Sequence, residues 1–172
     1  MKNSKSPAIR MSIIAVTTAI VAVFTIAIRI PTPVGGYISL CDVAVTFVSY
    51  TFGPLTGLIA GGLGTAISDL LGGFGQWAPV SFSVHGLEAL LIALIVRKNP
   101  DSLSLRILSA LVAVVVVAGG YFLLTGAFLI GFGAALPEVP ANIVQSAVGV
   151  LFGLPLSLAV RKAYRKIDDF AW

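Results

Sequence analysis

The chain has 172 residues, of which 58% are hydrophobic and only 10% are charged, and its formal net charge is +4. Soluble domains carry about 25% charged residues, so this composition predicts an integral membrane protein. A transmembrane helix needs roughly 20 apolar residues, so the length allows one helical bundle and leaves no room for a soluble nucleotide-binding domain. If the function of the protein needs ATP, another chain must hydrolyse it.

Apolar stretches, and the prolines and glycines between them, divide the chain into six predicted transmembrane helices within a single domain, residues 1–172. Their approximate bounds are 8–30, 37–52, 55–71, 82–96, 105–130 and 140–160. No small-residue cleavage site follows the first apolar run, so we expect that run to remain as the first helix. The second and fourth helices are short, and irregular backbone at membrane depth is tolerated where it lines a cavity. The sequence therefore predicts an all-α six-helix bundle with a binding pocket capped by loops.

Basic residues gather at both ends of the chain and in the loop between the fourth and fifth predicted helices, as at Lys5, Arg97 and Arg161. Cytoplasmic loops carry an excess of Lys and Arg, and an even number of helices places both termini on one side of the membrane. The pattern predicts cytoplasmic termini and a pocket that opens outward. Basic clusters of this kind are typical of membrane topology and do not indicate nucleic-acid binding.

In the first predicted helix, Ala15 and Ala19 are four residues apart and share one face. Small residues at this spacing let another backbone approach closely. The pair indicates either packing inside the bundle or a lipid-exposed face on which another subunit docks. Glycines at the same spacing, Gly57 and Gly61 in the third helix and Gly149 in the sixth, predict packing seams inside the bundle.

Two aspartates lie at helix ends with opposite electrostatic consequences. Asp42 begins the second predicted helix, where capping and the helix dipole favour a carboxylate, so we interpret it as structural. Glu138, at the start of the sixth helix, is interpreted in the same way. Asp69 lies near the outer end of the third helix, where the dipole disfavours a carboxylate. Asp69 therefore needs a partner, either Arg29 in an ion pair or a bound ligand.

The segment from Asp69 to Glu88 concentrates polar and aromatic side chains between two predicted helices, and it contains the only histidine of the chain, His85. Ser81, His85 and Glu88 are spaced so that they share one face of the fourth helix. A charge at the centre of a bilayer costs about 2.5–3.5 kcal/mol, so such groups persist where they face a cavity, a ligand or the interior of a bundle. We expect this segment to form the binding site.

Polar and aromatic residues elsewhere complete the predicted pocket. Asn142 and Gln145 lie one turn apart in the sixth helix, where their amides can join helices or bind a polar ring. Tyr121 offers a stacking surface in the fifth helix, while Tyr37 and Trp77 either stack on a ligand or belong to the interfacial aromatic belt. The predicted substrate-binding residues are Tyr37, Asp69, Gln76, Trp77, His85, Glu88, Tyr121, Asn142 and Gln145.

The sequence contains no phosphate-binding glycine loop, no His-Glu-x-x-His motif and no cluster of Cys and His residues. We therefore expect no catalytic site, no metal and no cofactor in this chain. A membrane-embedded enzyme that acts on a lipid or isoprenoid through Asp69, His85 and Glu88 is an alternative without such a motif. A solitary facilitator for a small metabolite is a second alternative.

Taken together, these features resemble the substrate-binding S components of energy-coupling factor (ECF) vitamin transporters. The resemblance covers nearly the whole chain, including the alanine pair of the first helix and the loop I-P-T-P-V-G-G-Y that leads to Asp42. It also includes the glycine run that ends in Asp69, and a W-A-P motif followed by His85, Gly86 and Glu88. The chain looks most like the branch with riboflavin-type and hydroxymethylpyrimidine- or pyridoxine-type S components.

The resemblance implies a multi-pass protein of a prokaryotic plasma membrane that binds a vitamin or vitamin precursor. Ala15 and Ala19 would dock on a membrane T component tied to two ATPase subunits, which hydrolyse the ATP, and the S component would topple within the membrane. The loop around Tyr37 would form a lid. The pocket residues combine aromatic rings, amides and one histidine, with Arg29 as the only basic candidate. This mixture favours a small, largely neutral heteroaromatic such as a pyrimidine or pyridine precursor, with riboflavin next.

Overall fold

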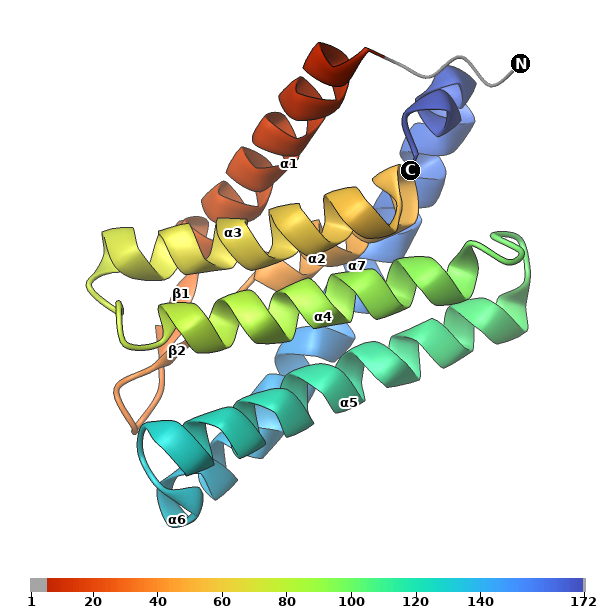
Figure 1. The fold of residues 1–172 in the computed structure, drawn as a ribbon. Helices are drawn as coiled ribbons and strands as arrows, with labels where there is room; N and C mark the ends of the chain where they lie inside the picture. Colours follow the sequence, from red (N-terminus) through yellow and green to blue (C-terminus); the bar gives the residue numbers. More distant parts are fainter. Residues whose placement is uncertain (1–5, 172) are drawn as a thin grey trace.

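The computed structural model describes residues 6–171, which form a bundle of helices with one small hairpin (Figure 1). The helices are α1 (Pro7–Ala27), α2 (Cys41–Phe52), α3 (Pro54–Gly72), α4 (Ala78–Val96), α5 (Leu103–Phe128), the short α6 (Phe132–Ala135) and α7 (Val139–Ala163). Two 3₁₀ helices, η1 (Leu136–Glu138) and η2 (Arg165–Phe170), flank α7. Strands β1 (Arg29–Pro31) and β2 (Tyr37–Ser39) pair as an antiparallel hairpin.

Five helical segments of the described residues are long and apolar enough to cross a membrane: α1, α3, α4, α5 and the segment Phe132–Ala163. The remaining apolar helix, α2, has only 12 residues. At 1.5 Å per residue it extends about 18 Å, which is less than the hydrocarbon core of roughly 30 Å. The expected short second helix is therefore present, and the count of six complete crossings stays a prediction.

The short helix α2 lies in the interior of the bundle, where it packs against α1, α3, α4 and α7. Glycines permit these close approaches. A Cβ atom on Gly149 of α7 would collide with Asp42, and one on Gly61 of α3 would lie 2.8 Å from the carbonyl oxygen of His85. The glycine seams predicted from spacing are thus confirmed as packing contacts inside the bundle.

The first loop differs from the expected all-α structure. Helix α1 ends at Ala27, the hairpin occupies part of residues 29–39, and α2 begins only at Cys41. Pro31 and the proline two residues later cannot continue a helix. Gly35 has a φ of +78°, which glycine adopts without a steric penalty, and it lies in the turn between the strands. The expected helix bounds 8–30 and 37–52 are therefore wrong in this segment.

Helix α4 also departs from its expected start near residue 82. It begins at Ala78, with Pro79 in its first turn. A proline is tolerated there because the first backbone N–H groups of a helix have no partner within the helix. The extra turn matters for the site, since it brings Trp77 and Ser81 onto the same helical end.

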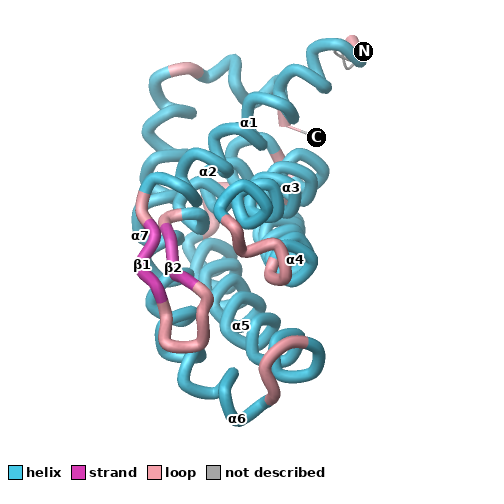
Figure 2. The backbone as a smooth tube through the Cα atoms, turned by 90° about the vertical axis from the view of Figure 1, so that its left-hand side faces the viewer, coloured by secondary structure: helices cyan, strands magenta, loops and turns pink. Residues whose placement is uncertain are grey.

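The ends of the elements separate into two groups (Figure 1). The start of α1, η2 and the α4–α5 loop lie at one end of the bundle, and the hairpin, the α3–α4 turn and α6 lie at the other. Strand β2 contacts both α1 and α7, and Figure 2 shows the hairpin beside α7. This grouping is the one that the predicted topology requires, although the orientation across a membrane remains an expectation.

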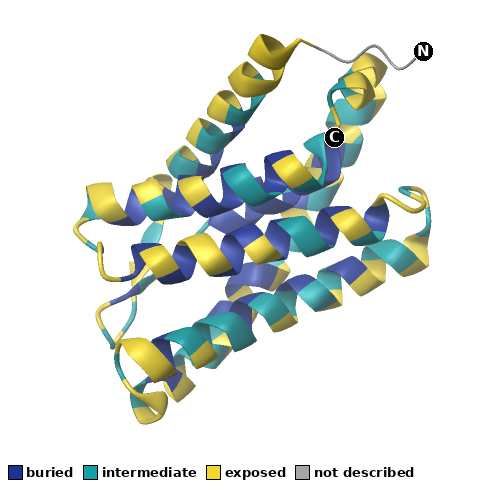
Figure 3. Cartoon of the chain, in the orientation of Figure 1, coloured by how far each residue is buried: buried dark blue, intermediate teal, exposed yellow. Residues whose placement is uncertain are grey.

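Helix α1 leans on the bundle with only part of its surface (Figure 3). Thr17, Val21 and Thr25 face the interior and are buried. Ala15 and Ala19 are exposed on the outer side of the helix. Of the two interpretations of the alanine pair, packing inside the bundle is therefore wrong.

Candidate functional site

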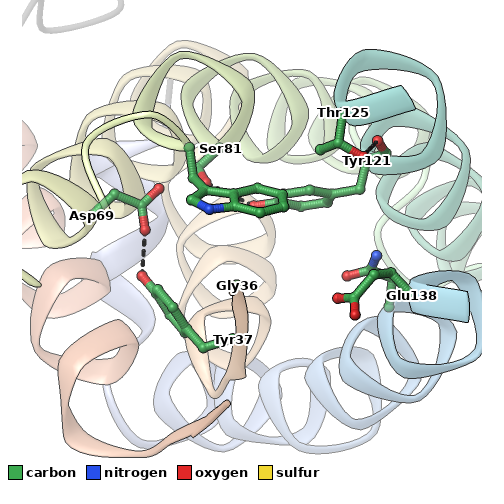
Figure 4. Close-up of a pocket in the computed structure, with 9 residues that line it drawn as sticks. Gly36, Tyr37, Asp69, Ser81, Tyr121, Thr125 and Glu138 are labelled. Atoms are coloured by element: carbon green, nitrogen blue, oxygen red, sulfur yellow. Dashed lines mark hydrogen bonds between the residues drawn. The ribbon is translucent and has the colours of Figure 1, made fainter. Parts of the chain in front are cut away.

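Two small cavities adjoin each other at the hairpin end of the bundle. The outer cavity has a volume of about 30 Å³ and is lined by Gly36, Tyr37, Asp69, Trp77, Ser81, Tyr121, Thr125, Glu138 and Asn142 (Figure 4). The inner cavity, of about 20 Å³, is lined by Thr25, Tyr37, Ser39, Cys41, Thr65, Ser81, His85, Tyr121, Asn142 and Gln145. Four residues line both cavities, so the two form one site at different depths.

Most of the residues predicted to bind substrate are brought together here. Those that line a cavity are Tyr37, Asp69, Trp77, His85, Tyr121, Asn142 and Gln145. Glu88 lies behind them, fully buried in contact with His85. Gln76 is exposed and lines neither cavity, because the turn before α4 directs the neighbouring Trp77 inward. The structure therefore gives Gln76 no contact with the site.

The hairpin closes the outer cavity through Tyr37. Its hydroxyl donates a hydrogen bond to Oδ1 of Asp69 (Figure 4). Burial raises the pKa of Tyr37 above its usual range, and the hydrogen bond to Asp69 raises it further, so this hydroxyl keeps its proton and donates it. The other oxygen of Asp69, Oδ2, is buried and has no partner in the described part of the chain. Asp69 thus has one oxygen on the hairpin and one available for a ligand.

Arg29 supports the hairpin from outside the cavities. Its Nη2 donates to the backbone oxygen of Ser68 at 2.7 Å, and its guanidinium lies 4.7 Å from the centre of the Tyr37 ring. A cation over an aromatic face is attracted by the ring quadrupole. Among the described residues no ion pair joins Arg29 to Asp69, so the partner expected for Asp69 is replaced by the Tyr37 hydroxyl.

Below the inner cavity, His85 lies between two buried carboxyl groups. Its Nδ1 is 3.1 Å from Oε2 of Glu88 and 3.0 Å from Oδ1 of Asp42. Its Nε2 is 3.1 Å from the hydroxyl of Tyr121 and 3.6 Å from Sγ of Cys41. The predicted shared face of His85 and Glu88 therefore exists, and it is joined by an aspartate from another helix.

Asp42 is the main site residue that sequence reasoning missed. We interpreted it as a structural residue at a helix start, and it does lie in the first turn of α2. Its position in the interior depends on α2 being short and surrounded by four other helices. The nearby sequence contains no signal for that placement, because the contact joins Asp42 to His85, more than 40 positions away.

Further polar contacts fix the depth of the site. The backbone N–H of Ser39 donates to Oε1 of Gln145 at 2.7 Å, which ties the end of the hairpin to α7. The hydroxyls of Ser81 and Tyr121 are 2.8 Å apart. Ser81 shares the helix face predicted for His85, and this shared face was the available signal for it. Glu138 was interpreted as a helix-start residue, and in the structure it lines the outer cavity.

The ligand atoms of Cys41, Asp42 and His85 all lie within 4.8 Å of one another, and these residue types can bind metals. Asp42 faces Nδ1 of His85, however, whereas Cys41 faces Nε2 on the opposite edge of the ring. One ion can bind only one of the two nitrogens. The three side chains therefore do not converge on a single coordination point.

A second feature, an open apolar groove, lies on the outer side of α1 and α3. Ala15 and Ala19 line it together with residues that include Ala22, Leu63 and Ile67. The groove shares no lining residue with the cavities, and almost all of its surface is apolar. It is therefore separate from the polar site.

Residues 6–162 match the sequence model of a family described as ECF-type riboflavin transporter, S component. The chain is 28% identical over 155 residues to the thiamine precursor transporter HmpT of Lactococcus lactis subsp. cremoris. The aligned region covers 89% of this chain and 88% of that protein. It is 30% identical over 143 residues to an uncharacterized protein in gap 3'region of Pyrococcus woesei, covering 83% and 95% of the two chains.

A solved structure described as the S component of a bacterial ECF transporter has the same fold. It matches with a TM-score of 0.57 at 22% identity, over 96% of this chain and 98% of that chain. At this identity the likeness establishes the fold alone. The apolar helices and this fold agree with a multi-pass membrane protein.

Proposed function

The chain belongs to the family of S components of ECF-type riboflavin transporters, and we propose that it captures a small vitamin or vitamin precursor for import. Members of this family are membrane-embedded transporter subunits and not enzymes. The observation that carries the proposal is the enclosed polar site at the hairpin end. There Tyr37, Asp69, His85 and Tyr121, from four different elements, face two connected cavities.

The charge of the site supports a neutral or amine-bearing substrate. Neither cavity is lined by lysine or arginine, and Asp69 and Glu138 contribute carboxyl groups. Such a site disfavours phosphorylated compounds, because a buried anion needs a cationic partner. His85, the one basic side chain that lines a cavity, already faces the carboxyl groups of Asp42 and Glu88. Trp77 and Tyr121 supply aromatic surface. Hydroxymethylpyrimidine or pyridoxine fits these properties, and the relative named as a thiamine precursor transporter supports the pyrimidine. Riboflavin, a larger ring system, is the alternative.

Substrate entry requires the hairpin to move. The cavities of about 30 and 20 Å³ are far smaller than the roughly 300–1,000 Å³ typical of ligand pockets. Tyr37, held by Asp69, covers the site from the hairpin side. The hairpin is therefore proposed to act as the lid, and the site would open toward the outside of the cell with both termini in the cytoplasm.

Transport is proposed to depend on partner subunits. Ala15 and Ala19, exposed in the apolar groove of α1 and α3, would dock on a membrane T component that is tied to two ATPase subunits. Small residues allow the close backbone approach that such a helix contact needs. This chain would carry no cofactor, and the partners would hydrolyse the ATP.

Reconstitution tests the proposal directly. The purified chain in proteoliposomes, alone or together with a T component and two ATPases, is supplied with radiolabelled hydroxymethylpyrimidine or pyridoxine. We expect uptake only with the partners and ATP inside the vesicles. Uptake of the same compound by the chain alone, down its gradient, would contradict the proposal and favour the solitary facilitator.

A further inference from the structure

Asp42, His85 and Glu88 form a buried ionisable cluster beneath the cavities, with exposed fractions of 0%, 1% and 0%. Nδ1 of His85 is within 3.1 Å of a carboxyl oxygen from each acid. Of these contacts, the one to Oε2 of Glu88 has hydrogen-bond geometry, whereas both oxygens of Asp42 and Oε1 of Glu88 have no hydrogen-bond partner among the described residues. A ring nitrogen that faces a carboxylate carries a proton, because a carboxylate only accepts hydrogen bonds and two lone pairs would otherwise oppose each other.

Burial at membrane depth requires that the charges of this cluster cancel. Two carboxylates beside a neutral imidazole would leave an uncompensated double negative charge, and no lysine or arginine lines the neighbouring cavities. One imidazolium, one carboxylate and one carboxylic acid sum to zero. A neutral imidazole with two carboxylic acids also sums to zero, so the positions of the two acids must decide between these states.

The helix positions favour the ionised state. Asp42 lies in the first turn of α2, where the helix dipole stabilises a carboxylate and gives a neutral acid no comparable benefit. Glu88 lies in the middle of α4, away from either helix end. Asp42 is therefore the carboxylate, and Glu88 is the neutral acid. Hydrogen bonds with an ionised partner are roughly twice as strong as neutral ones, which further favours the imidazolium.

The opposite edge of the ring faces the substrate site. Nε2 of His85 lies 3.1 Å from the hydroxyl of Tyr121, and that hydroxyl lies 2.8 Å from Ser81. An Nε2–H that donates to the Tyr121 oxygen directs the Tyr121 proton away from His85. That proton is then available either to the Ser81 oxygen or to an acceptor in the cavities that Tyr121 and Ser81 line.

We infer that the chain holds His85 as an imidazolium between Asp42 and Glu88, and that this charge makes Tyr121 a hydrogen-bond donor that selects substrates with an acceptor atom at the deep end of the pocket. The selectivity rests on the proposed substrate-binding function. At the shallow end, the unpartnered oxygen of Asp69 accepts a hydrogen bond. The site therefore recognises a ring with an acceptor on one edge and a donor on the other.

Other groups around His85 do not alter this charge count. Cys41 and Tyr121 face Nε2 as a neutral thiol and a neutral phenol. Helix α7 contributes the uncharged Gln145, whose amide nitrogen lies 3.6 Å from the thiol. Asp69 of α3 is engaged with the hairpin in the outer cavity. The titratable side chains that face the ring are Cys41, Asp42, Glu88 and Tyr121.

The single histidine of the chain makes this state directly measurable. Ligand-free protein labelled with ¹⁵N-histidine is studied by ¹⁵N NMR in detergent, where protonated and unprotonated ring nitrogens give separate signals. We expect both nitrogens of His85 to be protonated from pH 7 to pH 8. An unprotonated Nε2 at pH 7 would overturn the inference. Because no ligand is present, this result does not depend on the proposed function.

Two isosteric variants assign the charges. Glu88→Gln replaces a neutral acid with a neutral amide and should keep both nitrogens protonated. Asp42→Asn removes the carboxylate that the helix dipole stabilises and leaves only Glu88 beside the ring, so Nε2 should lose its proton at a lower pH than in Glu88→Gln. Equal behaviour of the two folded variants would contradict the assignment. If Asp42→Asn does not fold, the Glu88→Gln spectrum still decides, because loss of the Nε2 proton in that variant would place the carboxylate on Glu88.

A ligand pair tests the selectivity. Binding of a pyrimidine is compared with that of the same ring in which C–H replaces one nitrogen at a time. Removal of the acceptor that faces Tyr121 should weaken binding about tenfold. The same removal should have little effect in Tyr121→Phe. Equal affinity for every ring in the wild-type protein would overturn the selectivity. Absence of any pyrimidine binding, with the imidazolium confirmed by NMR, would instead count against the proposed substrate.

Discussion

The hydroxyl of Tyr37 should control how long a bound substrate stays in the site. In the closed hairpin this hydroxyl donates to Oδ1 of Asp69, while Oδ2 of the same carboxyl group is unpartnered. Asp69 can therefore hold the lid with one oxygen and a substrate with the other. The change Tyr37→Phe removes the lid contact and keeps the ring, over which the Arg29 guanidinium lies at 4.7 Å.

The size of the effect follows from the burial of the carboxyl group. A buried acceptor left without its hydrogen bond costs about 1–3 kcal/mol, and the exposed fraction of Asp69 is only 2%. This cost falls on the closed state, because water solvates Asp69 when the hairpin opens. Since 1.4 kcal/mol corresponds to a factor of ten, the closed complex should weaken about 5- to 150-fold.

Calorimetry and stopped-flow fluorescence measure the two consequences. We expect Tyr37→Phe to raise Kd by this factor, mainly through faster dissociation. Tyr164→Phe is the matched control, because Tyr164 is 53% exposed and follows α7 at the other end of the bundle. An unchanged Kd and dissociation rate, or tighter binding by Tyr37→Phe, would refute the proposed arrangement in which lid and substrate share Asp69.

Three further changes test other parts of the account. Ala15→Trp or Ala19→Trp should abolish partner-dependent uptake and leave the affinity for substrate within about twofold of wild type, since both residues are exposed and lie outside the cavities. An equal loss of substrate binding would contradict the docking role. Gly149→Ala should destabilise the protein by about 1–3 kcal/mol in detergent unfolding, because the added Cβ would collide with Asp42. Gly119→Ala is the control, because a Cβ at Gly119 has open space and should not destabilise the protein. Equal stability of the two variants would argue against the packing seam at Gly149. Trp77→Ala should weaken ligand binding by at least tenfold in calorimetry, and retained affinity would exclude stacking on this ring.

Much of the fold was predictable because it depends on local pattern. Apolar stretches of membrane length and the glycine spacing at Gly61 and Gly149 identify the helices and their seams. The hairpin was not predictable in this way, since its strands are only three residues long and pair through backbone groups. The prolines and glycines of that loop excluded a helix without specifying the pairing.

The site was predictable where function and helical spacing coincide. His85 and Glu88 share a face through a fixed repeat, and the unfavourable position of Asp69 at a helix end correctly indicated a need for a partner. Asp42 could not be placed, because its local position already satisfied a structural explanation. Gln76 was included as a polar residue of the segment from Asp69 to Glu88, yet consecutive residues at a helix start point in different directions.

The most direct test of the proposed function is calorimetric titration of the purified chain with hydroxymethylpyrimidine and with its phosphate ester. The cavities contain acidic, amide and aromatic side chains, no lysine or arginine, and one histidine, His85, whose charge is matched by the carboxyl groups at its Nδ1. We predict tight, one-to-one binding of the unphosphorylated compound and at least a hundredfold weaker binding of the ester, because a buried phosphate without an unpaired cation costs more than about 2.8 kcal/mol. Equal or tighter binding of the ester would contradict the account.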